Sequence, residues 1–322
     1  MKLFQYEHTL IFILLFFLGS IYLKLAKKYQ IIDKPNERSS HTNFTIRGGG
    51  IVFVFALGLF FLGNNFQYPY FIAGTIALAI ISFLDDIYTL SSKIRFPFQL
   101  LAVALLLHEV ALPFSPIAPY LSFLLLGIGV VNMFNFMDGI NGITGMYSFA
   151  SLVGFYAINA QENIVNNEII FYTFIAIGVF GFYNFRKKAL FFAGDIGSIS
   201  IGMLIYFVGV YLAVRLQAPL MFLAIFVYGA DAGCTLLYRK FFTNESIFAP
   251  HRHHIYQKLV HVKKIPHLTV SVIYAGIQLV LNIVLFFTYQ LPMTTQLLVL
   301  VGFIIVFITG YIVLFKKLER EL

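Results

Sequence analysis

The segment Leu121–Gly142, LSFLLLGIGVVNMFNFMDGING, is the most informative part of this sequence, because an uncharged apolar run ends there in amides, a carboxylate and two glycines. Asn132, Asn135 and Asp138 are spaced three apart, so on a helix they would share one face. Polar groups at the end of an apolar helix are costly unless they bind something. This stretch therefore predicts a membrane-spanning helix that ends either in a binding site or in polar residues that cap the helix.

The composition of the whole chain agrees with a membrane helix. Of the 322 residues, 60% are hydrophobic and only 11% are charged, whereas soluble domains carry roughly 25% charged residues. Without alternating apolar and polar segments, an all-α polytopic membrane protein is expected rather than a barrel. The net charge of +8 does not indicate nucleic acid, because the basic residues lie between apolar segments. The single cysteine, Cys234, excludes an internal disulfide.

The sequence contains eleven apolar segments that approach or exceed the length needed to cross a ~30 Å hydrocarbon core. They are Thr9–Leu23, Gly49–Leu62, Tyr70–Leu84, Phe98–Leu112, Tyr120–Phe134, Ile143–Ala160, Ile169–Phe185, Ile196–Val214, Leu220–Leu237, Thr269–Tyr289 and Gln296–Phe315. No internal repeat or separate soluble domain is visible. We therefore expect a single domain over residues 1–322, with about eleven transmembrane helices.

The distribution of basic residues predicts the orientation of these helices. Only Lys2 precedes the first segment, while Lys24, Lys27 and Lys28 follow it, which is the reverse of a signal peptide. With the N-terminus outside and the C-terminus cytoplasmic, 20 Lys and Arg residues fall inside and 2 outside. All six aspartates then lie in inside loops or at the inside ends of segments.

Two aspartates, Asp85 and Asp86, end the third segment. Adjacent carboxylates repel each other unless a cation or a raised pKa relieves them. Lys93 and Arg95 follow within one short loop. The pair is therefore either a solvated helix end with its counter-charges, or a metal site, a phosphate site or a general base.

The sequence Gly-Asp-Ile-Gly-Ser at 194–198 opens the eighth segment. The first N–H groups of a helix are unpaired and attract anions. Asp195 would repel a bound phosphate there unless a divalent cation bridged the two, and Mg²⁺ is usually held by one or two carboxylates plus substrate phosphates. The alternative is that Asp195 is a plain N-cap.

Three further features lie on the predicted inside. The first loop carries DKPNERSSH at 33–41 and RGGG at 47–50, which suit a polyanion, although basic inside loops are also the usual topology signal. HRHHIYQ at 251–257 suggests zinc, a diphosphate or sugar site, or an amphipathic stretch on the membrane surface. We favour the diphosphate or sugar, since Arg252 is a poor neighbour for a metal cation. Asp231 lies within the ninth segment, as a functional residue or in an ion pair with a basic residue.

Taken in order, these motifs resemble the polyprenyl-phosphate N-acetylhexosamine-1-phosphate transferases of the WecA, TagO and MraY type, and the resemblance covers nearly the whole chain. The matching positions are Asp85, Asp86 and Lys93; Asn132, Asn135, Asp138 and Gly139; and Asn184 with Gly194–Ser198. The first loop and the histidine-rich stretch look most like the WbpL-type branch that initiates O-antigen and capsule. Ile46 departs from that branch, which usually has proline there, and Tyr256 and Gln257 stand where the MraY and WecA types carry histidine.

The resemblance implies a reaction. A UDP-N-acetylhexosamine (GlcNAc, or a 6-deoxy relative such as QuiNAc or FucNAc) would react with undecaprenyl phosphate to give a lipid diphosphate sugar and UMP. This step would initiate O-antigen, capsule or teichoic-acid-type polysaccharide on the cytoplasmic face of the bacterial inner membrane. A homodimer is one arrangement that the sequence leaves open.

The resemblance also implies roles for individual residues. Asp195 and Asn135 would hold Mg²⁺, for which Mn²⁺ substitutes, and Asp85 would deprotonate or orient the lipid phosphate unless an aspartate forms a covalent intermediate. The catalytic residues would be Asp85, Asp86, Lys93 and Asp138, and the substrate-binding residues would be Lys34, Arg38, His41, Arg47, Asn132, Asn184, Arg252 and His254. The alternative from another class is a secondary transporter for an anionic solute, which would place ionisable groups near the bilayer midplane.

Overall fold

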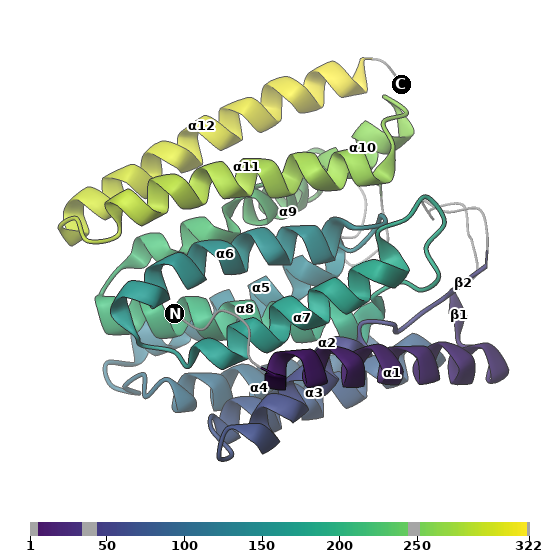
Figure 1. Cartoon of the computed structure of the whole chain (residues 1–322). Helices are drawn as coiled ribbons and strands as arrows, with labels where there is room; N and C mark the ends of the chain where they lie inside the picture. Colours follow the sequence, from purple (N-terminus) through teal and green to yellow (C-terminus); the bar gives the residue numbers. More distant parts are fainter. Residues whose placement is uncertain (1–5, 34–43, 244–251, 321–322) are drawn as a thin grey trace.

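The structure is a computed structural model that describes residues 6–33, 44–243 and 252–320. Within these residues the chain is almost entirely helical, and Figure 1 shows the long helices running side by side. The helices are α1 Tyr6–Lys28, α2 Ile51–Gly63, α3 Pro69–Tyr88, α4 Ser92–Glu109, α5 Ile117–Met137, α6 Ile143–Glu162, α7 Asn167–Asn184, α8 Gly194–Leu216, the 3₁₀ helix η1 Pro219–Ile225, α9 Phe226–Phe242, α10 Ile255–His261, α11 His267–Thr288 and α12 Met293–Glu319. Two short strands, β1 Ile32–Asp33 and β2 Thr45–Ile46, pair antiparallel.

Every one of the eleven predicted apolar segments is helical, which confirms the all-α class of this multi-pass membrane protein. By length and composition, seven helical segments of the described chain are suited to cross a membrane: α1, α3, α5, α8, η1 with α9, α11 and α12. The number of eleven crossings and the orientation of the termini remain predictions. Figure 1 shows β1, β2, α10 and the C-terminal end of α12 gathered at one end of the helices.

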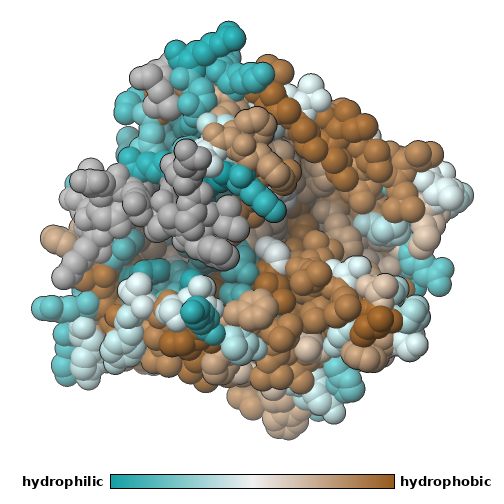
Figure 2. All heavy atoms as spheres, turned by 180° about the vertical axis from the view of Figure 1, so that it is seen from behind, coloured by the Kyte–Doolittle hydropathy of each residue, from teal (hydrophilic) through white to brown (hydrophobic). Residues whose placement is uncertain are grey.

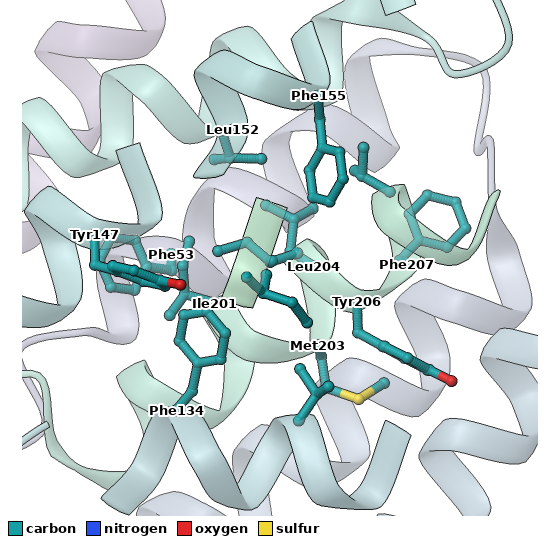
Figure 3. Close-up of a cluster of buried hydrophobic side chains, with 14 of the residues drawn as sticks. Phe53, Phe134, Tyr147, Leu152, Phe155, Ile201, Met203, Leu204, Tyr206 and Phe207 are labelled. Atoms are coloured by element: carbon teal, nitrogen blue, oxygen red, sulfur yellow. The ribbon is translucent and has the colours of Figure 1, made fainter. Parts of the chain in front are cut away.

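Helix α8 forms the centre of the molecule. Its residues are buried almost from end to end, and α2, α3, α5, α6 and η1 pack around it. Figure 3 shows part of this core, in which Ile201 and Leu204 of α8 lie among side chains of α5 and α6 such as Phe134 and Phe155. A helix that is apolar on all sides is suited to such an enclosed position. The buried position of α8 fixes its first residues, including Asp195, relative to the surrounding helices.

The ninth segment differs from the prediction because it is divided into η1 and α9. The change of helix type leaves backbone groups unpaired, which an apolar interior does not tolerate. Gln278 of α11 supplies partners by donating to Leu223 O at 2.8 Å and accepting from Val227 N at 3.3 Å. Tyr147 of α6 accepts from Tyr228 N at 3.2 Å and donates to Gln278 at 2.7 Å. Side chains of α6 and α11 therefore stabilise the break.

Candidate active site

The glycine run after β2 brings the first loop against the start of α8. Gly49 N donates to Phe192 O at 2.8 Å, and Gly50 N donates to Ala193 O at 2.9 Å. A Cβ added to Gly50 would lie 2.2 Å from the Cα of Gly197, so the two backbones pass too closely for a side chain. This close contact holds Arg47, two residues before Gly49, beside the first turn of α8.

Arg47 joins two of the predicted site aspartates. Its Nε lies 2.6 Å from Asp86 Oδ1, and its Nη2 lies 2.7 Å from Asp195 Oδ1. Asp86 also accepts from the backbone N–H groups of Asp195 at 2.8 Å and Ile196 at 3.2 Å. A carboxylate from α3 thus caps the start of α8 and satisfies N–H groups that the helix leaves unpaired.

Arg95 completes the cluster and was not among the predicted site residues. Its Nη1 lies 2.6 Å from Asp85 Oδ2 and 3.1 Å from Asp195 Oδ2. Lys93, which the resemblance favoured, is exposed at the start of α4. Positions 93 and 95 lie about 200° apart around a helix, so they cannot both face α3 and α8. If the start of α4 had been known from the sequence, the helical periodicity would have predicted that Arg95 and Lys93 face different sides of α4.

The three polar residues at the end of α5 have different partners. Asn132 exchanges hydrogen bonds with Gln99 of α4 at 3.1 and 3.2 Å. Asn135 donates to Ser198 Oγ at 3.3 Å and lies within hydrogen-bonding reach of the Asp195 carboxylate. Asp138 accepts from Thr144 Oγ1 at 2.5 Å. Of the three, Asn135 is therefore the one that directly contacts the start of α8.

Asp138 follows the last residue of α5, and the pKa of its carboxyl group is raised. Burial raises its pKa from 3.8 to about 7; the hydrogen bond from Thr144 opposes this rise, and the negative charge of Asp195 adds to it. A carboxyl group that titrates near neutral pH is suited to accept or donate a proton during a reaction.

Asn184 lies behind the site and binds the protein backbone. Its Oδ1 accepts from Gly142 N at 2.7 Å, and its Nδ2 donates to Phe191 O at 2.9 Å. Gly142 has a φ of +86°, a conformation that glycine adopts at little cost. Asn184 thus connects the turn after Asp138 to the segment that leads into α8, and we place it here as a residue that shapes the site.

The histidine-rich loop lies beside the same turn. His254 is buried and precedes α10, and its Nδ1 lies 3.4 Å from Asp231 Oδ1. Two residues after His254, Tyr256 of α10 donates its hydroxyl hydrogen to Phe136 O of α5 at 3.1 Å. Arg252 is half-buried. The remaining predicted binding residues of the first loop, Lys34, Arg38 and His41, lie outside the described residues, as does His251.

The side chains at this site suit a metal ion whose remaining ligands come from a bound substrate better than a metal ion held by protein alone. Among the described residues, no three His, Cys, Asp or Glu side chains are arranged to hold a metal ion. Asp195 and Asn135 nevertheless lie side by side, with the Asn135 amide N–H toward the carboxylate. Rotation of the amide would present its oxygen, and a carboxylate and an amide oxygen are ligands that Mg²⁺ accepts when substrate phosphates supply the rest. The residues therefore fit a Mg²⁺ ion that arrives with a phosphorylated substrate.

Comparison with known proteins finds a family model and named proteins to which this chain is similar. Residues 68–213 match the model of glycosyl transferase family 4. That range contains all four aspartates of the site, Asp85, Asp86, Asp138 and Asp195.

Individual proteins are similar to this chain over most of its length. A probable undecaprenyl-phosphate N-acetylglucosaminyl 1-phosphate transferase of Bacillus subtilis is 24% identical, over 78% of this chain and 75% of that protein. The undecaprenyl-phosphate alpha-N-acetylglucosaminyl 1-phosphate transferase of Yersinia pestis is 27% identical, over 81% and 78% respectively. The protein of the same name from Escherichia coli K12 is 26% identical, over 74% and 71%.

Proposed function

We propose that this chain transfers an N-acetylhexosamine 1-phosphate group from a UDP-sugar to undecaprenyl phosphate and releases UMP. The observation that carries the proposal is the cluster in which Arg47 and Arg95 join the carboxylates of Asp85, Asp86 and Asp195 at the end of apolar helices. The names of the relatives support the same reaction class.

The chemistry explains why such a cluster is useful. An oxygen of the lipid phosphate attacks the sugar-linked phosphorus of the UDP-sugar, a new P–O bond forms, and the bond from that phosphorus to the bridging oxygen breaks, so that UMP leaves with the bridging oxygen. Both reactants are anionic, and neutralising their charge is the main task of catalysis. Arg47 and Arg95 are suited to it, because a guanidinium group binds phosphate oxygens through two parallel hydrogen bonds.

The carboxylates have separate tasks in this proposal. Asp195, with Asn135 beside it, would hold Mg²⁺ or Mn²⁺, which supplies positive charge to the diphosphate when bound. Asp86 orients Arg47 and the start of α8. Asp85 is positioned by Arg95 and by Leu90 N, which donates to Asp85 Oδ1 at 2.5 Å. We assign to Asp85 the orientation or deprotonation of the lipid phosphate, and to Asp138 a second proton-accepting role.

The surface offers an approach for the lipid. Figure 2 shows a hollow that begins at the hydrophilic end of the molecule and continues between hydrophobic side chains. A lipid phosphate can enter such a site from the bilayer with its apolar chain on the hydrophobic surface. We propose that the site faces the cytoplasm of a bacterial inner membrane, and that the product begins an O-antigen, capsule or teichoic-acid-type polymer, as in a WbpL-like enzyme.

The test is a transfer assay with purified protein, undecaprenyl phosphate and a radiolabelled UDP-sugar. Label in an organic extract, with equimolar UMP, supports the transferase. If the label stays aqueous but is taken up by sealed vesicles that contain the protein, the chain is a transporter and the proposal is wrong. Running UDP-GlcNAc, UDP-QuiNAc and UDP-FucNAc in parallel identifies the sugar.

A further inference from the structure

A buried carboxylate of α9 is not used by the proposed reaction. Asp231 is 4% exposed, and a buried charge persists only where it is paired or hydrogen-bonded. Its partners lie at the start of α10: Ile255 N donates to Oδ1 at 3.0 Å, Tyr256 N donates to Oδ2 at 3.4 Å, and His254 Nδ1 lies 3.4 Å from Oδ1. One carboxylate thus holds three consecutive residues of the histidine-rich loop.

Asp231 also accepts hydrogen bonds from α11 and from its own helix. Tyr274 of α11 donates its hydroxyl hydrogen to Oδ2 at 2.6 Å, and Thr235, one helical turn further along α9, donates to Oδ1 at 3.3 Å. Both oxygens therefore accept from the protein on two sides. This saturation suits a residue that fixes a loop, rather than a base that exchanges protons with a substrate.

The start of α10 is in turn fitted against the end of α5. Tyr256 donates to Phe136 O, and the rings of His254 and Tyr256 stack with centroids 5.6 Å apart and planes inclined by 19°. Gly139 lies under the tyrosine, since a Cβ there would be 2.1 Å from the Tyr256 hydroxyl oxygen. The position of the loop is therefore matched to the segment that carries Asn135 and Asp138.

The other end of α10 has a separate attachment. Lys258 pairs with Glu319 of α12, and its ammonium group lies 4.5 Å from the centroid of the Phe315 ring. Loss of the Asp231 carboxylate would leave α10 attached through Lys258 and the Tyr256 hydroxyl, while its first backbone N–H groups would lose their acceptor. The effect would fall on His254 and on Arg252, two residues before it.

We infer that Asp231 is the positioning residue for the nucleotide-sugar side of the site, holding Arg252 and His254 against the end of α5. The inference rests on the proposed function for the identity of the ligand. The placement of the loop by Asp231 does not depend on it.

The test compares Asp231→Asn with Gln296→Leu in the purified full chain. Gln296 is a matched control, because it is 2% exposed and bonds to the backbone of Leu220, Tyr289 and Leu291 at the opposite end of α12. Hydrogen–deuterium exchange is measured over residues 255–261, together with the KM for the UDP-sugar and the KM for the lipid. Tyr274→Phe, which removes one donor to Asp231, is the milder variant if Asp231→Asn does not fold.

For Asp231→Asn we expect amide exchange over 255–261 to become about 10- to 100-fold faster, as for the loss of a hydrogen bond to a charged group. We also expect the KM for the UDP-sugar to rise about tenfold with little change in the KM for the lipid, and Tyr274→Phe to shift both readouts in the same direction. Gln296→Leu should lower the melting temperature without either change.

Unchanged exchange over 255–261, or equal increases in both KM values, would overturn the inference. If the wild-type chain shows no transfer activity, the proposed function fails, while the exchange measurement still decides whether Asp231 holds the loop.

Discussion

Arg95 and Asp195 are 100 positions apart in the chain, yet Arg95 Nη1 lies 3.1 Å from Asp195 Oδ2. The same nitrogen lies 2.6 Å from Asp85 Oδ2. One guanidinium group therefore connects the end of α3 with the start of α8. If substrate phosphates enter between these helices, Arg95 is positioned to bind them. The Asp195 carboxylate would then be available to bind a metal ion.

The first prediction concerns Arg95 and its neighbour Lys93. Arg95→Met should lower kcat/KM by about 10²–10³-fold, the usual effect of removing a donor that stabilises charge in a transition state. Lys93→Met should lower it only a few-fold, since Lys93 is exposed. Steady-state kinetics on both purified variants, with melting temperatures to show that each is folded, checks the prediction. Equal losses of kcat/KM in the two variants would contradict this prediction and support Lys93 as a site residue.

The second prediction concerns the metal. Transfer activity should be lost on chelation and restored by Mg²⁺ or Mn²⁺, and Asp195→Asn should reduce it by several orders of magnitude because the diphosphate loses its bridging cation. Glu109→Gln is the control: this carboxylate accepts from Tyr70 N at 2.7 Å, away from the site cluster, and its neutralisation should leave the metal requirement unchanged. Full activity in excess chelator would contradict the proposed metal site.

The third prediction concerns pH. Burial raises the pKa of Asp138 to about 7, so its ionised fraction falls about tenfold per pH unit below that value. If the ionised form is needed, kcat/KM should rise with pH and level off above about 7, and in Asp138→Asn the activity that remains should lack this rise. A pH profile between 5 and 9 decides the matter, and an identical profile in the variant would remove Asp138 from proton transfer.

The same pKa makes a prediction for stability. Between the ordinary pKa of 3.8 and about 7, the folded chain binds the Asp138 proton more tightly than the unfolded chain does. Stability from this group should therefore fall as pH rises through that window and stay constant above it. Melting temperatures at pH 5 and pH 8 should differ less in Asp138→Asn than in the wild type.

The fifth prediction tests topology with two serines, Ser92 at the start of α4 and Ser115 in the loop that follows α4. Ser92 and Ser115 are both exposed, and the charge distribution places the first inside and the second outside. In a Cys234→Ser background, Ser115→Cys should react with an impermeant thiol reagent in intact cells, whereas Ser92→Cys should react only after lysis. The reverse pattern would mean that the predicted number of spans is wrong.

Much of the candidate site could be predicted because its residues are unusual in an apolar chain. Charges at the ends of apolar segments are rare, which singled out Asp85, Asp86 and Asp195. The structure brings these three carboxylates together through Arg47 and Arg95. The choice between Lys93 and Arg95 depended on where α4 begins, which residue spacing alone did not establish. The different partners of Asn132 and Asn135 depended on which neighbouring helix each one faces.

Composition and hydropathy were sufficient to predict the membrane class, the eleven helical segments and the aspartates at segment ends. These follow from local properties, since an apolar segment in a bilayer must satisfy its own backbone hydrogen bonds and therefore forms a helix. The partners of these charges became known only from the packing of the helices: Arg47 pairs with Asp86 and Asp195, and Asp231 binds the start of α10. Such contacts join residues that are far apart in the sequence, and their geometry depends on how the helices and the first loop pack around α8, which no local pattern encodes.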